Sequence, residues 1–363
     1  MLHTDKLQQG QNYVLRSAGI DDNDFIEISV VAPAFNETEN IAVFTESVSA
    51  ELSKITDSWE IIFVDDGSSD NSLEVLQNLR SLDNRIKIIR FSRNFGHQIA
   101  ISAGLQYAAG NAVIVMDADL QHPPELIPQM IESWRKGYHI VCTIRTYNKE
   151  TGWFKRKSSE WFYSLCNIIS DVKFIDGAAD FRLLDRKAVD QFNAMPEQSR
   201  FVRGMIRWLG FKETYLKYTA NPRRHGVSKY SFKKMITFAI DGITSFSISP
   251  LRWIIYFGFS IAMISLLYTV YVLFEIIVTG NNTPGWPTLI VAVLFLGGMQ
   301  LISIGVVGEY VGRIYIETKK RPLFVVQEEY GFNFDNRQIG DNKENRFNND
   351  LKLLYSADQI NFA

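Results

Sequence analysis

The chain has 363 residues, of which 46% are hydrophobic and 21% charged, and its formal net charge is -2. This length allows about two domains, or one domain with appendages. The near-neutral charge gives no sign of a nucleic-acid surface, which is normally basic, so we expect no nucleic acid among its partners. The only cysteines are Cys142 and Cys166, without a CxxC pair, which predicts a reducing, cytosolic setting and no disulfide framework.

Residues 1–27 carry scattered charges and lack the continuous apolar core of an export signal. We interpret them as an N-terminal extension that stays in the cytosol.

From residue 28 onward, short apolar runs alternate with patterns of helical period. This alternation predicts an α/β domain whose mostly parallel sheet is covered on both faces. In such sheets ligands collect beyond the carboxyl ends of the strands. The predicted strands lie at 28–33, 59–67, 86–92, 112–119 and 139–145, and the predicted helices near 38–53, 70–81, 96–109 and 125–136.

Polar residues gather where four successive strands end. The runs are PAFNE, VDDGSSD, SRNFGH and DAD. Carboxylates meeting at one edge of a sheet can accept hydrogen bonds from a ribose diol and from a base N–H, which suits a nucleotide. Each run also has a simpler interpretation, since Asp70 can cap the following helix and Asp66 with Gly67 can form a turn.

The pair Asp117 and Asp119 follows an apolar strand, and residues two apart in extended chain point to the same side. The sequence contains neither GxGxxG nor GxxxxGK[ST], so another device must neutralise phosphates. A divalent ion held by one or two carboxylates, with water and diphosphate oxygens in the remaining positions, provides it. The alternative is a polar loop that caps the next helix.

Two later segments are long and apolar enough to cross a membrane as helices. Residues 253–278 contain one charge, Glu275, and residues 289–307 contain none. A pair of buried helices in a soluble core is the alternative. Because basic residues mark the cytoplasmic side, both ends of this hairpin are expected in the cytosol. These residues are Lys229, Lys233, Lys234 and Arg252 before it and Arg313, Lys319, Lys320 and Arg321 after it.

Residues 228–251 show apolar positions at spacings of three and four, with lysines on the opposite face. This pattern predicts an amphipathic helix in the headgroup layer, or else a surface helix packed on the soluble domain. The expected domains are thus 28–227, 228–251 and the two-helix membrane region 252–316. Residues 317–363 form a cytosolic tail, which is rich in Asn and Asp from Asn333 to Asp350 and is expected to be partly disordered after Pro322.

Seven blocks along the chain carry a family resemblance: PAFNE, VDDGSSD, RNFGH, DADLQHPPEL, DGAADFRLLDR, RFVRG and RRHGVSKYS. In this order they resemble the signature blocks of family 2 glycosyltransferases with the GT-A fold. The likeness is greatest to the polyisoprenyl-phosphate glycosyltransferases, namely bactoprenol glucosyltransferases and dolichol-phosphate mannose synthases. It covers about residues 28–316.

The resemblance implies inverting transfer of a hexose from a nucleotide sugar to polyprenyl (undecaprenyl) phosphate at the cytosolic face of the inner membrane. UDP-glucose is the favoured donor, and GDP-mannose the alternative. Related enzymes also suggest a homo-oligomer. Gly308 with Gly312 is a small-residue pair that either allows close helix contact or marks a flexible helix end.

The resemblance also assigns roles to residues of this chain. Asp117 and Asp119, with Gln121 nearby, would hold Mg²⁺ or Mn²⁺ on the donor diphosphate. Asp180 is the expected acid near the sugar and, with Asp119, the catalytic candidate. The residues expected to contact the base, ribose or nucleotide sugar are Pro33, Glu37, Asp65, Asp66, Arg93 and Asp117.

An acceptor phosphate monoester, with a second pKa of about 6, is already a nucleophile at neutral pH, so Asp180 either acts as a base or chiefly orients the sugar or acceptor. Arginine forks suit the acceptor phosphate, and we expect it to be bound by Arg145, Arg203, Arg224 and Lys229.

Two other functions remain open from the sequence. A processive polysaccharide synthase is disfavoured, because those relatives carry QxxRW where this chain has RFVRG. A two-span adaptor that merely binds nucleotides would leave the DAD pair, Asp180 and the basic residues without a joint purpose.

Overall fold

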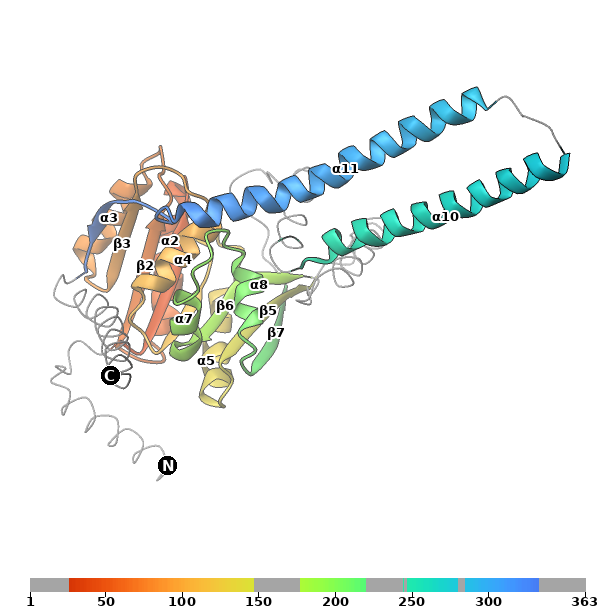
Figure 1. The fold of residues 1–363 in the computed structure, drawn as a ribbon. Helices are drawn as coiled ribbons and strands as arrows, with labels where there is room; N and C mark the ends of the chain where they lie inside the picture. Colours follow the sequence, from red (N-terminus) through yellow and green to blue (C-terminus); the bar gives the residue numbers. More distant parts are fainter. Residues whose placement is uncertain (1–25, 147–176, 220–243, 245–246, 280–284, 333–363) are drawn as a thin grey trace, which may run out of the picture.

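The computed structural model describes residues 26–146, 177–219, 244, 247–279 and 285–332. A sheet domain covered by helices carries a long helical hairpin that projects away from it (Figure 1). The helices are α2 (Thr38–Leu52), α3 (Ser72–Leu82), α4 (His97–Tyr107), the short 3-10 helix η2 (Pro124–Leu126), α5 (Ile127–Arg135), α7 (Arg186–Asn193), α8 (Val202–Trp208), α10 (Ser249–Thr279) and α11 (Trp286–Lys319).

The strands form one mixed sheet in the order β7-β5-β6-β4-β1-β2-β3-β8. The central strands β4, β1, β2 and β3 pair in parallel, as predicted. Their carboxyl ends therefore meet at one edge. The strands are β1 (Ile28–Ala34), β2 (Trp59–Asp65), β3 (Ile86–Phe91), β4 (Ala112–Val115), β5 (Ile140–Thr146), β6 (Ala178–Asp185), β7 (Glu213–Thr219) and β8 (Val326–Tyr330).

Helices cover both faces of the sheet, which explains why its central strands are continuously apolar. One core packs α2, α3 and α5 against alternate strand residues such as Val30 and Phe63. The other packs α4, α7 and α8 against the intervening residues such as Val31 and Val64. Gly104 lets α4 approach β1 closely, since a Cβ there would lie 2.1 Å from Val31 Cγ1. The predicted covered α/β sheet is confirmed.

Three strands lie outside the predicted alternation. β6 enters antiparallel between β4 and β5, β7 pairs in parallel with β5, and β8 adds antiparallel to β3. Residues 326–330 were expected in the partly disordered tail, because five residues after a long apolar helix give too short a pattern to distinguish a strand from a loop. This expectation is wrong, since their backbone pairs with β3 and makes them part of the sheet domain.

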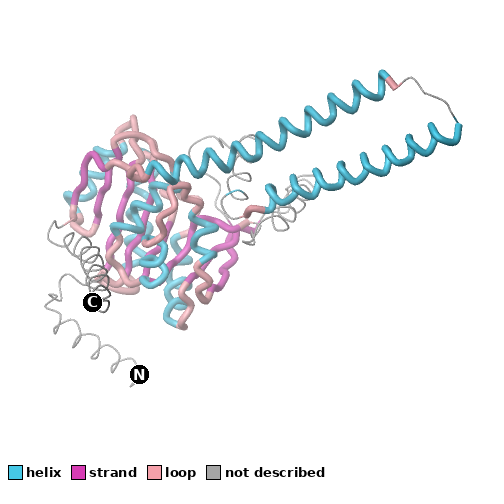
Figure 2. The backbone as a smooth tube through the Cα atoms, in the orientation of Figure 1, coloured by secondary structure: helices cyan, strands magenta, loops and turns pink. Residues whose placement is uncertain are grey.

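The two predicted apolar segments are helices α10 and α11, which run side by side (Figure 2). Both contain candidate membrane spans by length and composition, Ser249–Val272 and Phe295–Lys319, and no residue of either window is buried. The alternative of buried soluble helices is therefore wrong. α11 continues past the predicted span and returns to the sheet domain, where the Glu317 carboxylate accepts hydrogen bonds from the backbone N–H of Gln198 and Ser199.

Several predictions lie outside the described residues. They are the extension 1–25, most of the predicted amphipathic helix 228–251, and the tail from residue 333.

Candidate active site

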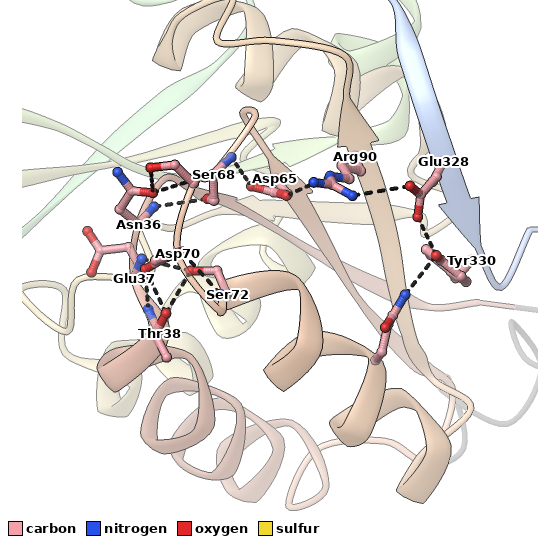
Figure 3. Close-up of polar contacts among 12 residues, drawn as sticks. Asn36, Glu37, Thr38, Asp65, Ser68, Asp70, Ser72, Arg90, Glu328 and Tyr330 are labelled. Atoms are coloured by element: carbon pink, nitrogen blue, oxygen red, sulfur yellow. Dashed lines mark hydrogen bonds and ion pairs between the residues drawn. The ribbon is translucent and has the colours of Figure 1, made fainter.

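The loop after β1 is built against the loop after β2 (Figure 3). Asn36 adopts a left-handed backbone with φ 56°, which asparagine tolerates better than most residues. Its backbone N–H donates to Ser68 Oγ at 3.0 Å, and its Oδ1 accepts from the Ser69 N–H at 2.9 Å. These reciprocal bonds fix the two loops as one polar surface at the strand ends.

Asp70 caps two helices at once. Its Oδ2 accepts from the Thr38 hydroxyl at 2.6 Å at the start of α2, and its Oδ1 accepts from the Ser72 N–H at 3.1 Å at the start of α3. Although desolvation opposes the change, hydrogen bonds from Ser72 and Thr38 lower the pKa of Asp70. Asp70 lies one residue before the N-cap position of α3, contacts the first residue of each helix, and in this way joins the two loops.

The neighbouring acids Asp65 and Asp66 are both buried. Asp65 Oδ1 accepts from the Ser68 N–H at 2.9 Å, which shapes its own loop. Asp66 accepts from the Phe95 N–H at 2.6 Å and the Gly96 N–H at 3.0 Å, which ties down the loop after β3. Burial raises the pKa of Asp66 despite these hydrogen bonds. Both acids organise the loops that line the strand ends, and their contact with a nucleotide stays a prediction.

Gly67 allows these loops to meet. It has φ 72°, and a Cβ there would lie 2.6 Å from the Arg93 backbone carbon. The exposed Arg93 stacks over the Phe95 ring, with its guanidinium carbon 4.0 Å from the ring centroid. Arg93 is thus held at the surface of the loop, and its contact with a ligand stays a prediction. Pro33 is buried within β1, and Glu37 is half-buried directly before α2.

Asp117 and Asp119 lie just beyond the end of β4, next to two histidines. The Asp117 N–H donates to His122 Nδ1 at 3.2 Å, and His97 Nε2 lies 3.4 Å from Asp117 Oδ1. The Gln121 N–H donates to Asp119 Oδ1 at 3.1 Å. Leu120 between them has φ 61°, a strained backbone for leucine that turns the chain sharply after the acid pair.

Asp180 on β6 is the buried centre of a charge cluster. Arg203 grips it with both nitrogens, Nε to Oδ1 at 2.7 Å and Nη2 to Oδ2 at 2.8 Å. Arg182 Nη2 donates to Oδ1 at 3.1 Å, and His97 Nε2 lies 3.7 Å from Oδ2. Burial alone would raise the pKa of Asp180, but Arg203, His97 and Arg182 hold it well below its usual range. Asp180 is an ionised, tightly engaged carboxylate.

His97 joins the two acidic groups and was not singled out from the sequence. It begins α4 and lies between Asp117 and Asp180. Desolvation opposes protonation, but the charge of Asp117 and the hydrogen bond to Asp180 raise the pKa of His97 to about 9. The only signal in the sequence is its place in the block RNFGH, which ends a strand as the other polar runs do.

Tyr218 also adjoins this edge without having been predicted. It is buried on β7, 6.1 Å from the His122 ring between centroids, and 6.3 Å from that of Phe181. Burial raises the pKa of Tyr218 to about 12, and the positive charge of Arg145 opposes this rise only in part. The exposed Arg145 on β5 is therefore within electrostatic reach of the acidic edge.

The acid pair fits a divalent cation that is shared with a substrate. Asp117 Oδ1 is buried and makes no hydrogen bond within the described residues. Those residues contain no group of three or more metal-binding side chains of the His, Cys, Asp or Glu type. The Asp117 Oδ1 atom has His97 Nε2 as an ion-pair partner at 3.4 Å. Mg²⁺ is commonly bound by one or two carboxylates with water and substrate phosphates in the other positions, so an acid pair at the strand end meets the requirement.

The residues predicted to bind the acceptor do not form one group within the described part of the chain. Arg203 is engaged with Asp180, and Arg145 is exposed near Tyr218. Arg224 and Lys229 lie outside the described residues. The acceptor site therefore stays a prediction.

Comparison with known proteins matches two family models to different parts of the chain. The model of glycosyl transferase family 2 matches residues 29–192, and that of the GtrB C-terminal hairpin matches residues 249–314. A Bacillus subtilis protein named as an uncharacterized glycosyltransferase is 44% identical over 84% of this chain and 95% of its own length. The chain belongs to glycosyl transferase family 2.

Other members of the family bear names with a stated activity. The bactoprenol glucosyl transferase of Shigella phage SfV is 42% identical over 84% of this chain and 99% of its own length. A solved structure of glucosyl-3-phosphoglycerate synthase from Mycobacterium tuberculosis aligns with 60% of this chain and 78% of its own, at 17% identity and a TM-score of 0.40. The present chain is thus a family 2 glycosyltransferase with a mostly parallel mixed sheet and a hairpin of two helices that are candidate membrane spans.

Proposed function

We propose that this glycosyltransferase transfers a single hexose, most favourably glucose from UDP-glucose, to polyprenyl phosphate at the cytosolic membrane face. The name of the phage relative supports the lipid acceptor and the sugar. The observation that carries the proposal is the junction between α11 and the sheet domain. Glu317, near the end of the lipid-facing hairpin, binds the backbone at Gln198 and Ser199. The same loop leads into α8, which carries Arg203.

With the hairpin in the membrane, this junction would bring the membrane surface close to the charged cluster. Only a few residues separate the α11 contact from Arg203, whose guanidinium grips Asp180. A lipid phosphate at the level of the headgroups would therefore lie a short distance from the sugar. A soluble acceptor would leave the hairpin without a role in the reaction.

Asp117 and Asp119, with Gln121 beside them, would hold the divalent ion. When bound, Mg²⁺ or Mn²⁺ supplies Lewis-acid stabilisation of the charge that develops on a leaving diphosphate. The protein's part is to place two carboxylates at the end of β4 and to fix them through His122 and the turn at Leu120.

The chemistry of the acceptor assigns Asp180 an orienting role rather than that of a base. A phosphate monoester with a pKa of about 6 is already ionised at neutral pH and needs no proton removed. Asp180 is paired with Arg203 and Arg182, and its pKa lies well below the usual range, which makes it a weak base. We propose that it holds Arg203 and the sugar in place while the lipid oxygen attacks the anomeric carbon with inversion.

Donor and nucleotide contacts are proposed at the polar surface formed by the first two loops. The residues proposed for these contacts are Pro33 near the end of β1, Glu37 directly before α2, and the exposed Arg93 in the loop after β3. The buried Asp65 and Asp66 would act mainly by shaping this surface.

A screen of nucleotide sugars against undecaprenyl phosphate in detergent, with the lipid product sized, tests the proposal. We expect one glucose per lipid from UDP-glucose in the presence of Mg²⁺ or Mn²⁺. Transfer from GDP-mannose instead would correct the donor, whereas a polymer would favour a polysaccharide synthase. No nucleotide release from any donor in the presence of lipid phosphate would favour an adaptor.

A further inference from the structure

Strand β8 attaches the chain that leaves the membrane hairpin to the edge of the catalytic sheet. α11 ends at Lys319, and β8 begins at Val326, antiparallel to β3. Phe324 stacks on Phe91 with ring centroids 5.1 Å apart, and the Ser92 N–H donates to the Val325 carbonyl at 3.0 Å. This segment is therefore firmly seated on β3, the strand whose following loop carries Arg93.

Three charged residues stand in one row across β2, β3 and β8. Strand register places Asp65 opposite Arg90 and Arg90 opposite Glu328. Arg90 Nη1 donates to Glu328 Oε1 at 3.1 Å, and Arg90 Nε lies 3.7 Å from Asp65 Oδ2 (Figure 3). The row alternates acid, base and acid. Opposite charges on directly opposed residues of neighbouring strands stabilise a sheet.

Tyr330 and Gln77 also hold Glu328 in place, through contacts separate from that with Arg90. The Tyr330 hydroxyl donates to Glu328 Oε2, and Gln77 Nε2 on α3 donates to the Tyr330 hydroxyl at 2.7 Å. The Glu328 side chain is 34% exposed, that of Arg90 26% and that of Asp65 0%, so the row runs from the surface into the core. Electrostatic coupling strengthens along such a row as water is excluded.

The inner end of the row leads to the proposed donor surface. Asp65 Oδ1 accepts from the Ser68 N–H, and Ser68 Oγ accepts from the Asn36 N–H. Asn36 directly precedes Glu37, a proposed donor contact. A continuous series of polar contacts thus connects Glu328 to the loop after β1 (Figure 3).

We propose that Glu328 is a positioning residue for the donor site: it orients Arg90, which orients Asp65, which fixes the Ser68 and Asn36 loops that receive the nucleotide. This inference rests on the proposed function, because it assumes that these loops bind the donor. The residues that follow the second membrane helix are then part of the support of the nucleotide site rather than a detached tail.

Glu328→Gln tests the proposal because it removes the charge and keeps the shape. In full-length protein in detergent, the KM for UDP-glucose should rise about three- to ten-fold, the size of a partly exposed charged hydrogen bond. The KM for undecaprenyl phosphate and the melting temperature should stay near wild type. Gln327 is exposed and directly precedes Glu328. Gln327→Ala is therefore the matched control and should leave both KM values unchanged.

A double-mutant cycle tests whether Glu328 acts through Arg90. The variant Arg90→Gln with Glu328→Gln should bind the donor no more weakly than Arg90→Gln alone. Tyr330→Phe provides a milder probe, since it removes only the hydroxyl that donates to Glu328, and a smaller rise of the donor KM is expected. Additive effects in the cycle would overturn the relay.

Two results with Glu328→Gln would overturn this inference and leave the proposed function intact. One is an unchanged KM for UDP-glucose, and the other is an equal rise of both KM values with a lowered melting temperature, which would mean that Glu328 only fastens the edge strand. Calorimetry with UDP and Mn²⁺ separates this from failure of the proposed function. Wild-type protein that binds neither UDP nor UDP-glucose would overturn the proposed donor site and this inference with it.

Discussion

The two sides of the candidate active site satisfy their polar groups in different ways. On one side, the loops after β1 and β2 bond mainly to each other through serine, threonine and asparagine groups, as at Asn36 and Ser68. On the other, formal charges of both signs crowd around Asp180, and Asp117 Oδ1 makes no hydrogen bond within the described residues. The first side is held mainly by neutral hydrogen bonds, and its buried Asp65 Oδ2, which makes no hydrogen bond in the described part of the chain, lies 3.7 Å from Arg90 Nε. The second side is held mainly by ion pairs, and Asp117 Oδ1 lies 3.4 Å from His97 Nε2.

This difference indicates a division of labour between the sides. A surface whose hydrogen bonds are already made has a fixed shape, which suits recognition of a nucleotide. A cluster of ion-paired charges is suited to reacting groups whose charge changes. Substitutions on the charged side should therefore lower turnover, and substitutions on the looped side should mainly weaken donor binding.

The largest effect is expected for Asp119→Ala. Removing one of the two proposed metal-binding carboxylates should lower kcat about 1,000-fold, the scale of losing a central electrostatic group. Turnover measured with UDP-glucose and undecaprenyl phosphate checks it. Asp190→Ala, which removes an exposed acid on α7, is the control and should retain activity. An Asp119→Ala enzyme with the kcat of wild type would contradict the division of labour between the charged side and the looped side.

Asp180→Asn should lower kcat about 100-fold, because it leaves Arg203 and Arg182 without their buried counter-charge. The pH profile of wild type distinguishes orientation from base catalysis. Since the folded-state pKa of Asp180 is lowered, the carboxylate remains charged as pH falls, and its stabilising contribution is lost only below its usual range. No loss of kcat assignable to this acid is therefore expected down to about pH 5, near the upper edge of ordinary carboxyl titration. An acid limb that disappears in Asp180→Asn would show base catalysis instead.

Asp70→Ala tests the looped side. It removes the cap shared by α2 and α3, so unfolding should become easier by about 1 kcal/mol, the usual value of a helix cap. The KM for UDP-glucose should rise a few-fold while kcat changes little, because the loops lose their fixed shape. Thermal melting and donor titration measure both effects. A fall in kcat without a change in donor KM would show that Asp70 supports turnover rather than donor binding, which would contradict the division between the two sides.

The smallest effect is expected for Gln121→Ala. Its backbone N–H, which the substitution retains, makes the observed bond to Asp119. Only a side-chain contribution to the metal site is lost, so the Mn²⁺ concentration for half-maximal activity should rise about two- to five-fold, well below the loss from removing a carboxylate ligand. An effect as large as that of Asp119→Ala would make Gln121 a principal ligand.

Much of the site was predictable because strand ends in a parallel sheet converge. Asp117, Asp65 and Asp70 follow apolar runs whose length and composition identify strands, so their common edge follows from topology. Their partners did not follow. Whether Asp70 caps one helix or two, and whether Asp65 faces ligand or backbone, depends on how the loops fold over one another.

Contacts between distant segments were the least predictable. Arg203 looked like a free phosphate ligand in the sequence, yet it pairs with Asp180, 23 residues away. Glu328 reaches Arg90 across 238 residues, through a strand too short to stand out after a long apolar helix. No local period encodes such a pairing, because strand register and burial determine it.

The central claim is that the Asp117 and Asp119 edge holds a divalent ion together with the donor diphosphate. Electron paramagnetic resonance of Mn²⁺ titrated into the full-length protein with UDP measures this directly. We predict a stoichiometric bound-Mn²⁺ signal in wild type that is lost in Asp119→Ala and retained in Asp190→Ala. Equal Mn²⁺ binding by wild type and Asp119→Ala, or no binding in the presence of UDP, would contradict the account.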